Sequence, residues 1–326
     1  MFLSTVQILA LQQISGIGTQ SILKLFSLPL ESSSALSISD LLSILSENKI
    51  KMKDPLGRGK IEVTTEALNE AIKKANNILS LSKQCGISAI SYFDNNFPEI
   101  LRNTKDESGK KFKPPLLLFY KGNISLLNDP CVAIIGTRNP SHSAINAGLY
   151  ISKEFAKRDF CIVSGLAIGC DTCGHQGAID VGGKTIAFLG NGLDTVYPAE
   201  NKKLASQILE SGGLLLSEYP IATKVSPYNL VDRDRLQAGL SIATIVIQTS
   251  ISGGTMHAAN ATLNSSKPLY VVKYKNEYDD KDKRNDGNRY LVQRGAKLLA
   301  GTANFDNIKD DIMCYQYINI SKTIKV

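Results

Sequence analysis

An arginine stands in a turn of small residues that directly follows an apolar run. Residues 132–135 lead into Gly136-Thr137-Arg138, and a second apolar run at 161–163 leads into Ser164-Gly165. Both runs are typical of buried strands, and each turn opens a helical span. In a doubly wound sheet, ligands bind where strands end and helix N-termini point N–H groups at anions. These turns predict a site for a phosphate-bearing ligand, with the Arg138 guanidinium as a bidentate donor; a solvated surface arginine is the alternative.

A third turn of this kind, Ser252-Gly253-Gly254-Thr255, lies between a predicted strand and a predicted helix. Its backbone N–H groups can cradle an anion. A catalytic cleft also needs a general base or nucleophile, and this turn offers His257 and no carboxylate. The first turn lacks the G-x-G-x-x-G pattern of dinucleotide sites. We therefore predict a binding site without catalytic residues, metal or cofactor.

Two further arginines, Arg233 and Arg235, flank Asp234 at the start of a predicted helix. Residues two apart on a helix point in different directions. One of the two arginines can therefore face the cleft while the other faces a neighbouring carboxylate, and Arg233 is the better candidate for a ligand contact.

Polar residues after the second turn each allow two interpretations. Asp171 is placed to cap the next helix or to face the cleft, and His175, one helical turn later, can touch phosphate or make a structural hydrogen bond. Cys170 and Cys173 have a metal-like or redox-like spacing, but no second ligand pair and no thioredoxin-like context accompany them. Tyr197 can hold its loop or stack on a base.

Short apolar runs alternate with helical spans from residue 130 to residue 272, which predicts a parallel sheet covered on both faces. The fold class is therefore α/β, with a doubly wound, mostly parallel sheet. We divide the chain into a helical N-terminal domain at 1–85, a sheet domain at 86–303, and a C-terminal helix and tail at 304–326.

The N-terminal domain is predicted to be all-α. Its first 30 residues read as two short helices around a turn with Gly16 and Gly18. They resemble a helix-hairpin-helix, whose turn offers N–H groups to DNA phosphates, and an ordinary helix pair is the alternative. A further helix is expected at 65–82, and the charged stretch 48–60 is expected to be a loop.

Composition restricts the class of protein without choosing a function. The 326 residues carry a net charge of +7, which suits an anionic partner but is also common among soluble proteins. No apolar run reaches the roughly 18 residues of a membrane span, and the N-terminus lacks the features of a signal peptide. The six scattered cysteines indicate reduced thiols and a cytoplasmic location.

Several stretches together, in order and with matching spacing, resemble the DNA-processing protein A family (DprA, also called Smf). They cover roughly residues 87–300: PPLLLFYKGN, VAIIGTRNP, IVSGLAIGCD, TIAFLGNGLDTVYPAEN, LLLSEYP, RDRLQAGLS, the SGGT turn and GNRYLVQRGAKLL. The resemblance implies an extended Rossmann-like domain that binds single-stranded DNA in a positive pocket. It also implies a homodimer that protects incoming or recombining strands and loads a RecA-type recombinase, without being an enzyme.

By motif match, Arg138 would be the main phosphate contact, beside the backbone of Gly136 and Thr137. Secondary contacts and the pocket lining would come from Ser164, Gly165, Arg233, Arg235, Ser252, Gly253, Gly254 and Thr255.

The chain departs from the family pattern at three places. Asp234 stands where the family usually has asparagine, Leu230 where an aromatic is common, and Met256-His257 where a leucine is common. Two alternatives therefore stay open. One is a nucleotide-processing hydrolase in the same cleft, for which the carboxylate after the glycine turn is missing. The other is a scaffold of the same fold with weakened DNA binding.

Overall fold

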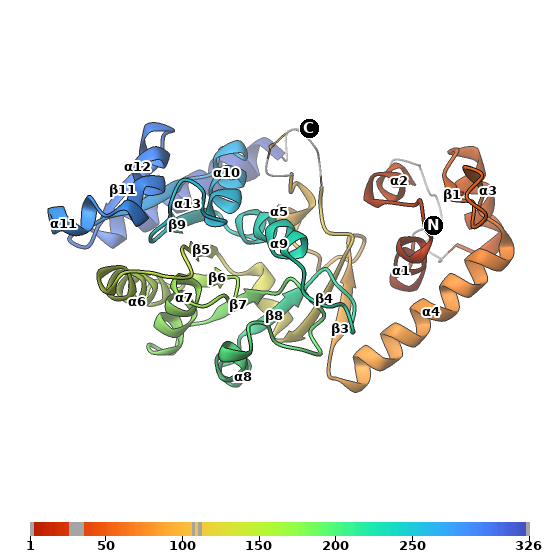
Figure 1. Ribbon diagram of the computed structural model, residues 1–326, viewed down its shortest axis with the longest axis horizontal. Helices are drawn as coiled ribbons and strands as arrows, with labels where there is room; N and C mark the ends of the chain where they lie inside the picture. Colours follow the sequence, from red (N-terminus) through yellow and green to blue (C-terminus); the bar gives the residue numbers. More distant parts are fainter. Residues whose placement is uncertain (1–2, 26–35, 106–107, 110–112, 324–326) are drawn as a thin grey trace.

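The computed structural model describes residues 3–25, 36–105, 108–109 and 113–323. Parts of the predicted N-terminal domain (26–35) and of the predicted tail (324–326) lie outside these residues. Figure 1 shows a twisted sheet with helices on both faces and a smaller helical domain at one of its edges. No described helix has the length and apolar character needed to cross a membrane.

Nine strands of the described residues form one sheet in the order β11-β10-β9-β5-β6-β7-β8-β4-β3. The seven strands from β11 to β8 are parallel, and β4 and β3 add an antiparallel edge. The predicted doubly wound α/β fold is confirmed. The bounds are β3 Ser88–Ser91, β4 Leu117–Gly122, β5 Cys131–Ile135, β6 Cys161–Ser164, β7 Thr185–Phe188, β8 Leu214–Ser217, β9 Ala243–Val246, β10 Leu269–Lys273 and β11 Lys297–Ala300.

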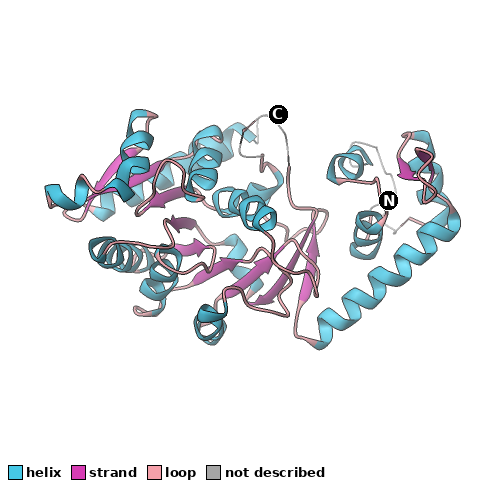
Figure 2. Ribbon diagram, viewed as in Figure 1, coloured by secondary structure: helices cyan, strands magenta, loops and turns pink. Residues whose placement is uncertain are grey.

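Successive side chains of the central strand β5 enter two different cores, which explains its continuous apolar run. Val132 and Ile134 pack with α6 and α7, whereas Ala133 and Ile135 pack with α10 and α12. Figure 2 shows these helices in cyan against the magenta strands. One layer contains α6 His142–Ala156 and α7 Cys170–Ile179, and the other contains α10 Thr255–Asn264 and α12 Asp286–Gln293.

The direction of winding reverses between β5 and β9. From β5 the chain adds β6, β7 and β8 on one side, and it then crosses back through α9 (Pro227–Leu240) to place β9 on the other side. At such a reversal the loops after the two neighbouring strands diverge and leave a crevice. The turn with Arg138 and the SGGT turn follow these two strands, so the topology brings both to one place.

Other helices complete the two layers and the loops. They are η2 Ile124–Asn128, α8 Lys202–Glu210 after η3 Ala199–Asn201, α5 Glu99–Arg102, α11 Glu277–Asp280, η4 Lys283–Asn285 and α13 Phe305–Thr323. The polar stretch after β10 contains α11 and η4.

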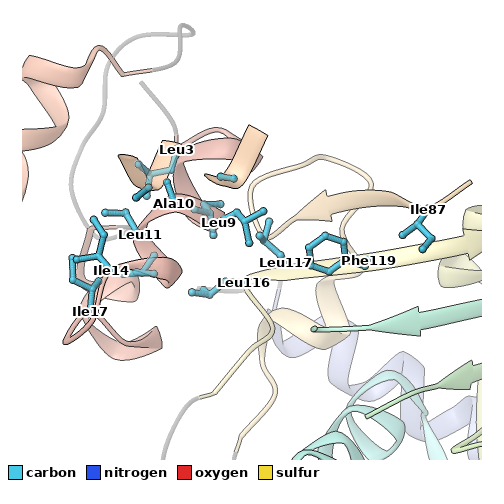
Figure 3. Close-up of a cluster of buried hydrophobic side chains, with 14 of the residues drawn as sticks. Leu3, Leu9, Ala10, Leu11, Ile14, Ile17, Ile87, Leu116, Leu117 and Phe119 are labelled. Atoms are coloured by element: carbon cyan, nitrogen blue, oxygen red, sulfur yellow. The ribbon is translucent and has the colours of Figure 1, made fainter. Parts of the chain in front are cut away.

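The N-terminal domain packs through apolar side chains against the β3–β4 edge. Figure 3 shows Leu9 of α1 beside Leu117 of β4, with Phe119 further along the strand. Since these residues belong to one buried cluster, the domain shares a core with the sheet. Its helices are α1 Thr5–Gln13, α2 Thr19–Lys24, α3 Ile38–Glu47 and α4 Thr65–Gln84.

The N-terminal domain is not all-α as predicted, and the stretch predicted to be a loop forms a hairpin. Strands β1 (Lys51–Lys53) and β2 (Lys60–Glu62) pair antiparallel. The alternation of charged residues with Met52 and Ile61 suits a strand, and Asp54 closes the turn by accepting hydrogen bonds from the N–H of Leu56 and the side chain of Arg58. Because this stretch is rich in charged residues, its composition suggested a loop although its residues alternate as in a strand.

Candidate nucleic-acid interface

The turn after β5 is held rigidly while its arginine remains exposed. The Thr137 N–H donates to the carbonyl of Gln248 at 2.7 Å, which ties the turn to the end of β9. Gly136 is packed so closely that a Cβ would lie 2.5 Å from Sγ of Cys170. The Arg138 side chain is exposed, and no hydrogen bond or ion pair holds it among the described residues. A fixed backbone thus presents an available guanidinium.

The loop after β6 packs against this turn and fixes its backbone. Gly169 has φ +85°, and a Cβ there would lie 2.5 Å from the Thr137 carbonyl oxygen and 2.8 Å from the Arg138 carbonyl. Only glycine tolerates both this backbone conformation and this approach. The N–H of Cys170, at the start of α7, donates to Thr137 at 3.1 Å. The position of Arg138 is therefore determined by two neighbouring strands.

Arg138 lies at the wall of a cavity of about 490 Å³ at the winding reversal. Five of the predicted site residues line it: Gly136, Arg138, Arg233, Gly254 and Thr255. The guanidinium of Arg138 and the glycine turn before α10 therefore lie on the same cavity, as the prediction of a shared site required. The remaining lining comes from Ile135, Ala167, Asp171, Tyr197, Val225, Ser226, Pro227, Leu230, Val231, Asp234, Gln237 and Ala258.

The start of α10 contributes backbone donors to this cavity. Gly254 is the N-cap residue, it has no side chain to cap the helix, and no atom lies within 4 Å of its Cβ position. The N–H groups of Met256 and His257 donate to the carbonyls of Gly253 and Gly254, so the helix dipole and the N–H groups of Gly254 and Thr255 favour a negative charge here. Ser252 and Gly253 shape the turn, although they are not among the residues that line the cavity.

The floor of the cavity holds a buried ionic cluster of Arg233, Asp171 and Asp234. Arg233 donates from Nη1 to the carbonyl of Phe188 at 3.1 Å, and its Nε lies 3.3 Å from Oδ1 of Asp234. Gly165 makes room for it, since a Cβ there would lie 1.5 Å from Nη1 of Arg233. With only 4 % of its surface exposed, Arg233 acts mainly as a buried counter-charge.

Burial changes the acidity of both carboxyl groups in the cluster. It raises the pKa of Asp234 to about 6, against the opposing effect of the Arg233 guanidinium. Burial also raises the pKa of Asp171, again opposed by Arg233. Asp171 does not cap α7 with its side chain. It accepts hydrogen bonds from the N–H groups of Gly165 (3.1 Å) and Ala167 (3.3 Å) and so fixes the loop ahead of the helix.

Arg235 points away from the cavity and is paired inside the protein. Its Nη2 lies 2.6 Å from Oε2 of Glu218, its Nη1 lies 3.4 Å from Oδ2 of Asp232, and its Nε donates to the carbonyl of Lys113. The prediction that one of the two arginines would face a neighbouring carboxylate describes Arg235. Its motif-based assignment as a DNA contact has no support from this geometry, because only 5 % of the residue is exposed.

His175 and Ser164 also have structural positions. Oγ of Ser164 donates to the Ile134 carbonyl at 2.6 Å, and both residues are fully buried. Nδ1 of His175 lies 2.7 Å from Oγ1 of Thr185, which itself donates to the Ile162 carbonyl. Nδ1 is therefore the donor. Burial lowers the pKa of His175 to about 3, so the ring is neutral at physiological pH.

We expect Thr185→Val to reduce the free energy of unfolding by about 1.5 kcal/mol, because it leaves the buried N–H of His175 without an acceptor. Urea unfolding of both proteins measures this difference. DNA affinity below the unfolding transition should stay within twofold, since neither residue lines the cavity. An unchanged unfolding midpoint would show that the hydrogen bond contributes nothing.

The sequence predicted two cationic residues of the cavity, Arg138 and Arg233, but it did not predict most of the cavity wall. It did not assign a site role to Asp234, Gln237 or the stretch 225–231, which together form much of the lining. Tyr197, for which the sequence allows two roles, lines the cavity with 41 % of its surface exposed. Cys170 and Cys173 are buried free thiols, and no cluster suited to a metal occurs within the described part of the chain.

Fold and site together define a class: a doubly wound α/β protein with a cavity at the winding reversal that is lined by an arginine and by the start of a helix. Within this class, the sequence profile of the family described as DNA recombination-mediator protein A matches residues 88–310. The match spans more than half of the chain, and the protein therefore belongs to this family.

Named relatives agree with this assignment. The chain is 35 % identical to the DNA processing protein DprA of Streptococcus pneumoniae over 188 residues, covering 58 % of this chain and 64 % of that protein. It is 31 % identical to Protein Smf of Escherichia coli over 57 % of this chain and 48 % of that protein. The alignments thus cover less than two thirds of either relative.

Solved structures extend the similarity beyond the sheet domain. The crystal structure of DprA from Streptococcus pneumoniae matches 92 % of this chain and 95 % of that chain, with a TM-score of 0.73 and 29 % identity. DprA from Helicobacter pylori, described for its single-stranded DNA binding mode, matches 70 % of this chain and 95 % of that chain, with a TM-score of 0.57 and 29 % identity.

Proposed function

We propose that this protein binds single-stranded DNA in the cavity between the turn after β5 and the start of α10. One observation carries the proposal: an exposed guanidinium, which no hydrogen bond or ion pair holds among the described residues, stands on a rigid turn at the same cavity as the open start of α10. Phosphate is the anion that matches a planar bidentate donor and backbone N–H groups together. The relative from Helicobacter pylori, described as binding single-stranded DNA, supports the same ligand.

The biological role follows from the family and belongs to this proposal. The protein acts as a recombination mediator that protects incoming or recombining single strands and loads a RecA-type recombinase, as a cytoplasmic homodimer. We assign no catalytic step to the cavity, because Asp234 is paired with Arg233 and Asp171 is held by two backbone N–H groups.

A binding titration with oligonucleotides tests the proposal. We expect tight binding to single strands of ten or more nucleotides, much weaker binding to a duplex of equal length, and an affinity that falls steeply with salt. On single strands the logarithm of the affinity should fall by about 0.7 per neutralised phosphate for each unit of log salt concentration. Equal affinity for single strand and duplex would contradict the proposal.

We expect Tyr197→Ala to lower affinity for single-stranded DNA about fivefold, because the exposed ring is placed to stack on a base. Tyr278→Ala is the matched control: this ring is 81 % exposed but lies outside the cavity. Fluorescence anisotropy with a 15-nucleotide strand compares the two variants. If both bind like the unmodified protein, Tyr197 holds its loop and contacts no base.

A further inference from the structure

The β1–β2 hairpin of the N-terminal domain has an unusual arrangement of charges. Between residues 49 and 62 it has five cationic side chains and only two carboxylates. Lys51 faces Glu62 across the hairpin and pairs with it at 3.2 Å, and Arg58 pairs with Asp54 at 2.8 Å. These two pairs use both acidic groups, and the remaining cations are Lys49, Lys53 and Lys60.

Lys53 and Lys60 are directly opposite each other in the register of the two strands. Like charges in this position destabilise an antiparallel pair. Both side chains are exposed, and neither has an ion pair or side-chain hydrogen bond to any described residue. The register thus places two lysines opposite each other with no counter-charge among the described residues, which is the arrangement expected of an anion site.

The same face of the hairpin lies against the glycine turn between α1 and α2. The N–H of Lys53 donates to the Ser15 carbonyl at 2.7 Å. Gly16 has φ +98°, and a Cβ there would lie 2.8 Å from the Lys53 backbone nitrogen and 3.1 Å from Cγ of its side chain. Gly16 is therefore explained by its contact with β1, and that contact fixes Lys53 beside the turn.

We propose that Lys53 and Lys60 form a second DNA-binding site, which holds the phosphate backbone of a DNA segment outside the cavity. The chemistry is electrostatic: two ammonium groups bind adjacent phosphates and release counterions, without contact to bases. The ordered turn around Asp54 keeps the two strands in register, so the lysines are positioned before the DNA arrives. The two sites together would hold a longer strand than the cavity alone.

The test compares Lys53→Gln/Lys60→Gln with Lys73→Gln/Lys83→Gln in the full chain. The control removes the same charge from exposed lysines of α4 in the same domain. We expect the hairpin variant to bind a 60-nucleotide single strand about tenfold more weakly at 0.1 M salt, with a shallower salt dependence. Binding to a 10-nucleotide strand should be unchanged, and the control should match the unmodified protein.

Two further measurements separate this inference from the proposed function and from misfolding. In an Arg138→Ala background, residual binding to the long strand or to a duplex should still depend on Lys53 and Lys60. Lys60→Glu should raise the melting temperature, because it forms a pair with Lys53, and should weaken long-strand binding further. The second site does not exist if the hairpin variant binds the long strand as well as the control does, and the duplex as well as the control does. Loss of 10-nucleotide binding in Arg138→Ala tests the cavity alone.

Discussion

Arg138→Ala is expected to lower the affinity for a 15-nucleotide single strand about a hundredfold, or roughly 2.7 kcal/mol. The guanidinium is exposed on the cavity wall, on a turn fixed by Gln248, Gly169 and Cys170. Since no hydrogen bond or ion pair among the described residues involves this side chain, its removal should cost the proposed bidentate phosphate contact and leave the fold intact. Fluorescence anisotropy at fixed salt measures the loss.

Two companion variants separate geometry from charge. Arg138→Lys keeps the charge but loses the planar pair of donors, and we expect an intermediate affinity. Lys203→Ala removes an equal charge from the exposed face of α8 and should bind almost normally. If Arg138→Ala binds within threefold of the unmodified protein while its melting temperature is unchanged, the cavity does not bind phosphate through this residue.

The fold could be predicted from the sequence wherever one local pattern decided the structure. Continuous apolar runs such as residues 131–135 are typical of strands covered on both faces, and the glycine turns that follow them mark the strand ends. The β1–β2 hairpin could not be predicted in this way. Each of its strands has three residues, and the alternating positions are held by charged residues. The charge therefore suggested a loop, although the two strands pair.

The candidate site shows a similar division. Residues in turns at strand ends converge because the topology requires it, and Gly136, Arg138, Gly254 and Thr255 do line one cavity. Motif position could not reveal what a side chain meets across the fold. Arg235 pairs with Glu218, and Gly165 is needed because Arg233 passes over it, and both facts depend on tertiary contacts.

Asp234 and Asp171 both line the cavity with carboxyl groups that oppose a polyanion, and Asp234 is the one of the two that no backbone N–H group holds among the described residues. Its carboxyl group lines the cavity, with Arg233, Asp171, His257 and Arg138 as the charged groups that act on it. Since burial raises its pKa to about 6, the group is largely ionised at pH 7.5 and largely protonated at pH 5. A nearby phosphate disfavours the ionised form. DNA affinity should therefore rise as the pH falls through 6.

Asp234→Asn is expected to increase affinity for single-stranded DNA about thirtyfold at pH 7.5, or roughly 2 kcal/mol, because it removes a charge that repels the phosphate at an effective dielectric constant of about 20. The variant should also bind with a flatter pH profile between 5 and 8. His175 cannot supply that profile, since burial lowers its pKa to about 3.

The substitution should not weaken the fold. Because the folded-state pKa of Asp234 lies above its usual value, the stability that its protonated form provides is lost as the pH rises to 6. A neutral amide avoids that loss, so the melting temperature at pH 7.5 should be equal or higher. Asp194→Asn, which changes an exposed carboxylate outside the cavity lining, is the matched control. If Asp234→Asn binds more weakly than the unmodified protein, Asp234 positions Arg233 for the DNA and does not oppose binding. If the pH profile of the variant is unchanged, Asp234 is not the titrating group.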